Sequence, residues 1–254
     1  ILRSLSFDSQ TYVVSVGTGC LGHCTYCAIK NAKGGLVSRP LPLIADEIKS
    51  GLARGYNRFH LVGDDVGCWG QDLGTNSAAL LKEILKNKET FELIVNYFDP
   101  TWLTRHYEEL VEPLSDPRVV CVNFPLQSGS TRLVRRMARH YDVEKVLEQT
   151  ASIKRANPTM VSKTHLMVGF PEETLADFQM TLDAVKHFDL IFPNRFAPRI
   201  GTPAAKSLSP IADSEKNRRF RKLKNSILAR HLQVAAQALT RPQKPQLKMS
   251  EAFA

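Results

Sequence analysis

The stretch Gly19-Cys-Leu-Gly-His-Cys-Thr-Tyr-Cys-Ala28 contains three cysteines in the spacing C-x3-C-x2-C. Cys20, Cys24 and Cys27 follow the apolar run Tyr12–Val16, which predicts a β-strand. A [4Fe–4S] cluster usually takes four cysteine ligands, and the sequence offers no fourth cysteine at a matching spacing. A cluster held by three thiolates leaves one iron with an open coordination position. The motif therefore predicts a metal cluster whose free iron binds a further ligand.

Two other kinds of site match parts of the same stretch. A structural zinc site needs four ligands, usually in paired C-x2-C units, and His23 would have to be the fourth. Gly17, Gly19 and Gly22 also match the G-x-G-x-x-G pattern of a dinucleotide-binding loop. That fold places an acidic residue at the end of a second strand, whereas Asp46 lies within a predicted helix. We therefore expect these glycines to let the chain wrap tightly around a cluster.

The composition indicates one globular domain in a reducing compartment. Of the 254 residues, 43% are hydrophobic and 23% are charged, which suits a large domain with a buried core. No apolar stretch is long enough to cross a bilayer or to form a signal peptide, so we expect a cytoplasmic protein without a membrane partner. Five cysteines, three of them clustered, are not a disulfide framework. The net charge of +9 permits an acidic partner such as RNA.

Strand-like and helix-like segments alternate along the chain. The predicted strands are Thr11–Val16, Arg58–Val62, Glu92–Tyr97, Val119–Phe124, Lys163–Val168 and Ile191–Phe196. The predicted helices are Leu43–Arg54, Ser77–Asn87, Thr101–Leu114, Val143–Ala156, Leu175–Phe188 and Ser214–Leu239. Six βα units predict an α/β fold, a partial (β/α)6 TIM-like barrel over residues 1–239, with an open doubly wound sheet as the alternative. Residues 240–254 are expected to form a linker or tail.

Polar segments follow the predicted strands, where a parallel fold gathers its active groups. Gly63 and Asp64 follow the second strand, in a glycine-rich loop that lets the backbone approach a ligand. Gln127 and Ser128 follow the fourth strand, and their amide and hydroxyl groups suit a ribose or a carboxylate. Arg139 is expected to hold a carboxylate through a charge-assisted hydrogen bond. An ordinary βα turn and a capped helix start remain alternatives for these segments.

The cysteine motif resembles the signature of the radical S-adenosylmethionine (SAM) superfamily, C-x3-C-x-aromatic-C, with Tyr26 at the aromatic position. The resemblance implies that the free iron binds the amino and carboxylate groups of SAM. It also implies that an electron from the cluster cleaves SAM to a 5'-deoxyadenosyl radical, and that the fold is the partial barrel. From about Thr11 to Ala205 the chain is also similar to the methylthiotransferases of this superfamily, through the segments Ser38–Pro40, Pro125–Ser130, Val168–Thr174 and Arg199–Ala204.

This resemblance implies roles for single residues. The thiolates of Cys20, Cys24 and Cys27 hold the cluster. The residues expected to contact SAM are Tyr26, Gly63, Asp64, Gln127, Ser128, Arg139, Gly169, Phe170 and Arg199. Gly169 is expected to pair its backbone with the adenine edge, Phe170 to lie near the adenine ring, and Arg199 to point into the mouth of the barrel.

Methylthiotransferases replace a C–H hydrogen with a methylthio group. The resemblance therefore implies tRNA or a ribosomal protein as substrate, and a reductant protein such as flavodoxin or ferredoxin as electron donor. The family also has an amino-terminal domain with a second cluster and a carboxyl-terminal RNA-binding domain, and we expect both to be absent from this chain. A radical SAM enzyme acting on a peptide or metabolite, and a non-catalytic RNA-binding or metal-stabilised module, are the alternatives.

The chain departs from the usual family pattern at several positions. Glu172 replaces a glycine, His165 stands where an acid is common, Asp64 stands where glutamine is common, and Lys33 replaces an arginine. These differences bear on the identity of the substrate. Of the two remaining cysteines, Cys121 is expected to be a small buried residue of the fourth strand, and Cys68 lies on the loop after the second strand, where it is either structural or a ligand.

Overall fold

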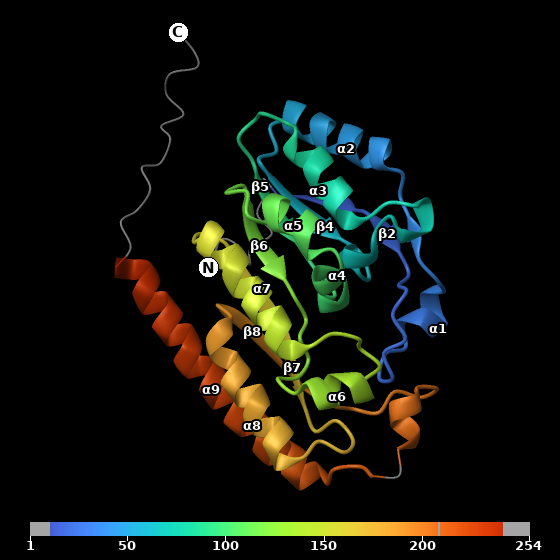
Figure 1. Cartoon of the computed structure of the whole chain (residues 1–254), viewed down its shortest axis with the longest axis vertical. Helices are drawn as coiled ribbons and strands as arrows, with labels where there is room; N and C mark the ends of the chain where they lie inside the picture. Colours follow the sequence, from blue (N-terminus) through green and yellow to red (C-terminus); the bar gives the residue numbers. More distant parts are fainter. Residues whose placement is uncertain (1–10, 208, 241–254) are drawn as a thin grey trace.

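The computed structural model describes residues 11–207 and 209–240, which form one parallel sheet with helices packed against it (Figure 1). The six strands are β1 (Thr11–Ser15), β4 (Arg58–Val62), β5 (Glu92–Val95), β6 (Val119–Asn123), β7 (Val161–Val168) and β8 (Leu190–Arg195). Each pairs in parallel with the next along the chain, and the order never reverses as a doubly wound sheet requires. Within the described chain β1 and β8 are not paired with each other, so the predicted partial (β/α)6 barrel is confirmed.

Helices cover the outer face of this sheet. They are α2 (Leu41–Ala53), α3 (Ser77–Leu85), α4 (Pro100–Arg105), α5 (Tyr107–Leu114), α6 (Thr131–Arg136), α7 (Val143–Ala156), α8 (Leu175–Ala184) and α9 (Asp213–Thr240). The core lies between the two layers, where strand residues such as Val14, Leu61 and Val122 are fully buried. Alternate strand residues point to the other face, so Val13 is 46% exposed inside the barrel beside the fully buried Val14.

Most predicted elements are found, with differences that have local causes. The helix predicted over Thr101–Leu114 is divided at His106, whose backbone (φ −115°, ψ 28°) leaves the helical region. The helix predicted over Leu175–Phe188 ends at Ala184 and continues as a 3-10 turn, Val185–His187. The short elements that sequence periodicity did not predict are α1 (Ile29–Lys33), α6, the hairpin of β2 (Gly17–Thr18) and β3 (Val37–Ser38), and the 3-10 turns Val66–Cys68, Gln71–Leu73 and Pro203–Lys206.

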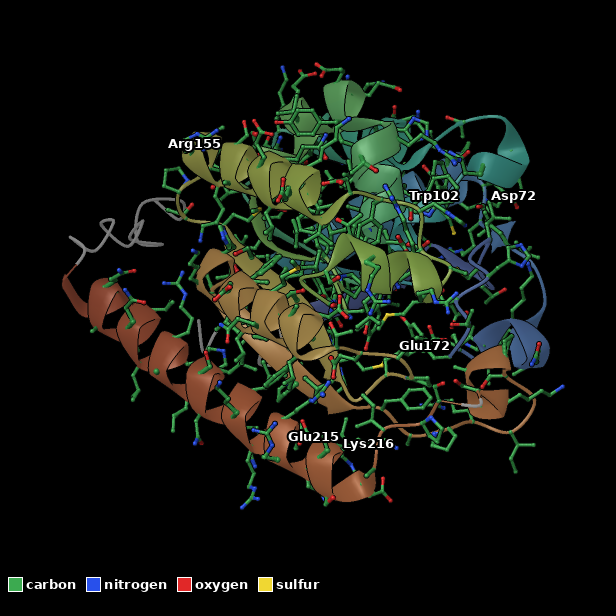
Figure 2. The ribbon with its side chains drawn as sticks, turned by 60° about the horizontal axis from the view of Figure 1, so that its bottom comes forward. Asp72, Trp102, Arg155, Glu172, Glu215 and Lys216 are labelled. Carbon is green, nitrogen blue, oxygen red and sulfur yellow. The ribbon has the colours of Figure 1, made fainter. Side chains whose placement is uncertain are left out.

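The long helix α9 covers the edge strand β8 (Figure 1). The backbone N–H of Ile191 donates to Nε2 of His231 at 3.0 Å. The His231 side chain of α9 thus accepts from a backbone N–H for which the edge strand β8 has no neighbouring strand. Glu215 and Lys216 lie near the amino-terminal end of α9 (Figure 2).

The predicted tail begins at the last residue of α9, and its remainder, 241–254, lies outside the described residues. None of the helices in the described part of the chain is long and apolar enough to cross a membrane.

A buried ion pair joins α9 to the loop after β7. Nη1 of Arg219 lies 2.7 Å from Oε2 of Glu173, and their side chains are 7% and 0% exposed. The same carboxylate oxygen accepts the N–H of Gly169 at 2.9 Å. Removing one partner of such a pair leaves a charge buried without compensation.

We expect Arg219→Met to lower the free energy of unfolding by about 3–5 kcal/mol, measured by urea denaturation. The matched control is Arg218→Met, because Arg218 is exposed and its pair with Glu215 is screened by water. Burial raises the pKa of Glu173, and losing Arg219 would raise it further. A carboxyl with a raised folded-state pKa takes up a proton as pH falls, so the deficit should be smaller at acidic than at neutral pH. Equal stability of the two variants would contradict this account.

Candidate metal centre

The loop that carries the cysteines is fixed at its start by a glycine. Gly19 has φ +74°, and a Cβ atom there would lie 1.9 Å from the carbonyl oxygen of Gly35. Only glycine combines this conformation with so close an approach. The N–H of Gly19 donates to Oδ2 of Asp64 at 2.9 Å, and Lys33 holds the other oxygen of that carboxylate at 2.9 Å. Asp64, at the end of β4, therefore anchors the loop that leaves β1.

The middle of the loop is tied to two more segments. The N–H of Thr25 donates to the carbonyl of Met137, just after α6, at 3.0 Å. The carbonyl of Thr25 accepts the N–H of Ala204, after β8, at 2.9 Å. Segments that follow β4, β6 and β8 thus hold the cysteine loop across the mouth of the barrel.

The three motif cysteines line one cavity of about 460 Å³ at the carboxyl ends of the strands. Tyr97, after β5, and His165, in β7, line the same cavity. A cavity of this size, with a few polar groups in defined places, is typical of a small-molecule site. All five cysteines of the chain are free thiols.

The spacing of the sulfur atoms favours a cluster over a single ion. With Zn–S bonds of about 2.3 Å, tetrahedral zinc holds its sulfurs about 3.8 Å apart. Within the described chain, the one set of three potential ligand atoms within 4.8 Å of one another belongs to Cys20, Asp65 and Cys68. At least one pair of the three motif sulfurs therefore lies more than 4.8 Å apart, which is wider than one zinc ion allows and suits thiolates bound to separate irons. His23 instead contacts Nζ of Lys30 at 3.0 and 3.2 Å.

Asp65 lies beneath the cysteine loop and is fully engaged by the protein. Its carboxylate accepts the N–H of Gly67 (3.0 Å), the N–H of Asp99 (3.1 Å) and the indole N–H of Trp102 (2.8 Å). Trp102 comes from α4 (Figure 2). Burial, followed by the nearby Asp99 carboxylate, raises the pKa of Asp65 to about 8. Because three donors already satisfy it, Asp65 acts as a structural support of the loop.

Cys20 and Cys68 lie against this support. The Cys68 thiol donates to the carbonyl of Asp65 at 3.1 Å, and Sγ of Cys20 accepts the N–H of Gly22 at 3.1 Å. A hydrogen bond with Cys68 lowers the pKa of Cys20 to about 7, although burial opposes the shift. Burial raises the pKa of Cys24 to about 11. The polypeptide thus stabilises the thiolate form of Cys20, and that of Cys24 needs a further positive charge such as a metal supplies.

Arg139 is the buried cation of the site, with 5% of its surface exposed. Its guanidinium pairs with Asp99 at 2.9 Å, donates to the carbonyl of Pro125 at 2.9 Å and to the hydroxyl of Tyr26 at 3.1 Å. Nη1 also lies 3.8 Å from Sγ of Cys24. Burial disfavours the charge, but Asp99 and the surrounding groups hold the pKa of Arg139 well above its usual value. A fixed positive charge therefore faces the thiols.

Two residues at this edge have left-handed backbone. Tyr97 (φ +49°) follows β5 and Gln127 (φ +67°) follows β6, and both line the cavity. This conformation costs a non-glycine residue about 1–3 kcal/mol and is often found at functional sites. Gln127 is held in it because its N–H donates to His165 (2.8 Å) and its carbonyl accepts from Met167 (2.6 Å).

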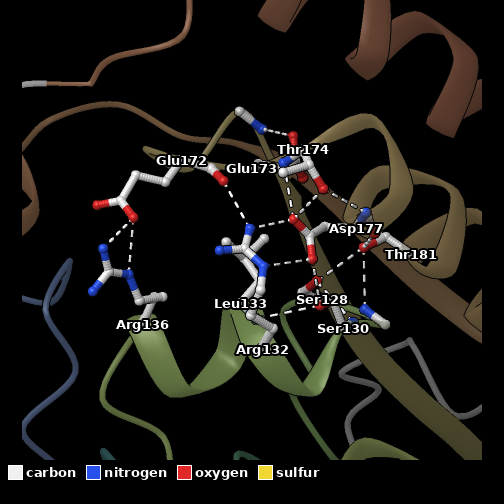
Figure 3. A network of polar contacts seen from close by, with 12 residues as sticks. Ser128, Ser130, Arg132, Leu133, Arg136, Glu172, Glu173, Thr174, Asp177 and Thr181 are labelled. Carbon is white, nitrogen blue, oxygen red and sulfur yellow. Dashed lines mark hydrogen bonds and ion pairs between the residues drawn. The ribbon is translucent and has the colours of Figure 1, made fainter.

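The structure brings together seven of the residues predicted from sequence. Those that line the cavity are Cys20, Cys24, Cys27, Tyr26, Asp64, Gln127 and Arg139. Gly63 lies next to Asp64 but does not line it. Ser128 does not line it either, because its fully buried hydroxyl contacts Thr181 of α8 at 3.0 Å and accepts the N–H of Ser130 at 3.1 Å (Figure 3). Ser128 therefore braces the loop after β6 against α8.

Three more residues that were predicted to contact SAM do not line the cavity. The N–H of Gly169 donates to Glu173, so a pairing with adenine would have to use the backbone that follows it. Phe170 is 4% exposed and packs against Phe196, with ring centroids 5.4 Å apart. Arg199 is exposed and does not line the cavity, so its contact with SAM stays a prediction.

The sequence reasoning missed Asp65, Asp99 and Tyr97. A usable signal existed for Asp99, which precedes Pro100 and caps α4 by accepting the N–H of Thr101 at 2.8 Å. An acidic cap directly after a strand places a carboxylate at the carboxyl edge of the sheet. Asp65 also caps a turn, because it accepts the N–H of Gly67, but its other two donors, from Asp99 and Trp102, lie in a distant segment and leave no local signal.

Comparisons with known proteins agree with this geometry. The Radical SAM superfamily matches residues 14–185. Human threonylcarbamoyladenosine tRNA methylthiotransferase is 35% identical over 210 residues, covering 81% of this chain and 36% of the relative. The tRNA-2-methylthio-N(6)-dimethylallyladenosine synthase of Clostridium botulinum is 34% identical over 236 residues, covering 88% and 51%. The chain thus spans about a third to a half of the length of these relatives.

The fold is shared with solved structures. The radical SAM methyltransferase TsrM from Kitasatospora setae, solved with cobalamin and a [4Fe-4S] cluster, matches 76% of this chain and 38% of its own with a TM-score of 0.62 and 18% identity. Methylornithine synthase (PylB) matches 88% of this chain and 68% of its own with a TM-score of 0.50 and 12% identity. At these identities the likeness establishes the architecture.

We expect Asp64→Ala to release the start of the cysteine loop, because the N–H of Gly19 would lose its acceptor. Hydrogen exchange of the Gly19 amide in the metal-free protein should then accelerate at least about tenfold, as expected for losing about 1.4 kcal/mol of protection. The control is Lys33→Met, which removes only the half-exposed ion pair and should leave this amide protected. Unchanged exchange in Asp64→Ala would show that the loop is held by other contacts.

Proposed function

We propose that this chain, which belongs to the radical SAM superfamily, carries out the SAM-dependent reaction of a tRNA methylthiotransferase. The observation that carries the proposal is the 34–35% identity to two types of tRNA methylthiotransferase, which extends over 81–88% of the chain. The cavity lined by the three cysteines offers the metal ligands that this chemistry requires.

The residues around the cavity fit the two cofactors. Cys20, Cys24 and Cys27 would bind three irons of a [4Fe–4S] cluster as thiolates, and SAM would fill the rest of the cavity. When bound, these cofactors supply an electron and a sulfonium whose reduction gives a 5'-deoxyadenosyl radical. The protein positions and shields this chemistry.

The polypeptide contributes a positive charge and holds the cysteine loop in place. Arg139 offsets negative charge next to Cys24 and is one of two cations, with Lys30, that line the cavity and could meet a SAM carboxylate. The N–H of Gly22 donates to Cys20 and favours its thiolate. Asp64 anchors the loop rather than presenting a free carboxylate, because both of its oxygens are engaged. Tyr26, bonded to Arg139, closes one wall of the cavity.

The partners follow from the same reasoning. A tRNA substrate is an anion, so it suits the net charge of +9. It also suits a cytoplasmic location. The cluster needs a low-potential electron, for which a flavodoxin or ferredoxin is a suitable donor. Leu21 and Ile29, which flank the cysteines, are each 38% exposed and offer such a donor an apolar contact.

We expect the anaerobically reconstituted chain to bind about four irons and to form 5'-deoxyadenosine from SAM with dithionite. Cys24→Ala should lose the cluster absorption and at least about 100-fold of the product, because one of three ligands is gone. Cys121→Ala is the matched control, since Cys121 is a buried thiol on β6 outside the cavity. Zinc bound in place of iron, or as much 5'-deoxyadenosine from Cys24→Ala as from the parent chain, would contradict the assignment to radical SAM chemistry. Mass spectrometry of tRNA nucleosides, for a gained methylthio group, separates this reaction from other radical SAM reactions.

A further inference from the structure

We propose that Lys163 and His165, on the inner face of the barrel, form an anion-binding subsite for a carboxylate on the substrate. The inference rests on the proposed function and names the substrate class within it. The substrate would be a tRNA adenosine whose N6 substituent ends in a carboxylate, rather than in a hydrocarbon.

The alternation of β7 points both side chains into the barrel. Ser162, Thr164 and Leu166 are fully buried, whereas Lys163 and His165 are only partly buried. His165 lines the cysteine cavity. Lys163 lies two residues earlier on the same face, about 6.6 Å along the strand. Of the two, only His165 lines the cavity itself, and Lys163 lies next to it on the same face of β7.

One aromatic ring holds the two side chains together. Nζ of Lys163 lies 4.8 Å from the ring centroid of Phe192, on β8, and the His165 ring stacks on the same ring at 5.4 Å with an interplanar angle of 21°. Tyr97 approaches His165 from β5, with centroids 5.8 Å apart. Phe192 and Tyr97 are 36% and 43% exposed, so the barrel interior has an open aromatic surface beside the cation.

Within residues 11–207 and 209–240, no carboxylate forms an ion pair with Lys163. Asp64 pairs with Lys33 and Asp99 pairs with Arg139, so the acids nearest the cavity are engaged elsewhere. A partly buried ammonium without an anion costs stability, and burial lowers the pKa of Lys163 accordingly. A bound carboxylate would supply the missing charge.

His165 offers a hydrogen-bond donor next to this cation. Its Nε2 is inaccessible to water and has no hydrogen-bond partner in the described part of the chain. The side-chain nitrogen of Asn194 lies 3.5 Å from Nδ1, and with Asn194 donating there the neutral ring carries its proton on Nε2. Burial, and then the Lys163 charge, lower the pKa of His165 to about 4, so the ring is neutral at neutral pH. The Lys163 ammonium supplies the charge for a carboxylate, and the N–H at Nε2 of His165 can add a hydrogen bond once the ligand displaces the groups that cover it.

This arrangement should discriminate between N6 substituents. A threonylcarbamoyl group ends in a carboxylate, whereas a dimethylallyl group is a hydrocarbon that would leave the ammonium desolvated and unpaired. Sites built around a buried polar group reject analogues that lack its partner far more strongly than apolar pockets reject extra atoms. The carboxylate of SAM is the competing source of the same chemistry, and the test has to separate the two.

The test is calorimetric binding of nucleosides to the reconstituted, SAM-loaded chain. The probes are N6-threonylcarbamoyladenosine, its methyl ester, which removes only the charge, and N6-dimethylallyladenosine. We expect the acid to bind at least about tenfold more tightly than the ester, a difference of about 1.4 kcal/mol. Lys163→Met should abolish this preference, Lys163→Arg should retain most of it, and Lys186→Met, at an exposed lysine outside the barrel, should leave it unchanged.

Several outcomes would overturn the subsite. The first is equal binding of the acid and the ester, and the second is no measurable binding of the acid. The third is a Lys163→Met variant that binds SAM more weakly but the nucleoside equally well, which would assign the Lys163 charge to SAM. Lys163→Met should melt no lower than the parent chain, because it removes a desolvated charge, so lost folding is not a competing explanation. Formation of 5'-deoxyadenosine is measured on the same samples. Intact SAM cleavage without discrimination rejects the subsite alone, whereas discrimination without SAM cleavage rejects the proposed function.

Discussion

Parallel pairing in chain order is the constraint on which the site depends. Because each strand lies beside the next, the loops after β1, β4, β5, β6, β7 and β8 all meet at one edge of the sheet. The cysteine loop after β1 can therefore be tied to Asp64, Met137 and Ala204, which are far away in sequence. The loop is short and rich in glycine, and its geometry comes from these anchors rather than from secondary structure of its own.

The second constraint is the balance of charge behind the cysteines. Asp65 and Asp99 lie close together in a buried region, and Arg139 is the cation that pairs with Asp99 while facing Cys24. Removing water strengthens each of these interactions and makes each unpaired charge costly. The network explains why Arg139 is buried at all, and why its guanidinium is bonded on every side. A fixed positive charge of this kind stabilises thiolates that lie beside it.

Much of this could be predicted from sequence, for reasons specific to each element. Arg58–Val62 and Val143–Ala156 were predicted with their observed bounds, because both have clear apolar periodicity and the second has Asp142 as its cap. The cysteines were recognisable by their spacing alone. The side chains of Ser128 and Arg199 could not be placed from sequence, because position after a strand says which edge a residue occupies, but not whether its side chain turns to the cavity, to α8 or to solvent. Asp65 was missed because two of its three donors, the N–H of Asp99 and the indole N–H of Trp102, come from a distant segment.

The barrel interior shows how function and stability compete within one fold. The outer face of β7 is packed with fully buried residues, whereas its inner face presents Lys163 without a recorded ion pair and His165 with a buried unbonded nitrogen in the described chain. The adjacent strand ends carry Tyr97 and Gln127 in left-handed backbone. Each of these features costs folding free energy, and Tyr97, Gln127 and His165 line the cysteine cavity. Such folding costs are tolerated where a bound ligand offsets them. The ligand then gains the most binding energy from the groups that are strained or lack hydrogen-bond partners in the empty protein. His165, Tyr97 and Gln127, which line the cavity together with the thiols, are therefore the groups whose folding cost a bound substrate could offset.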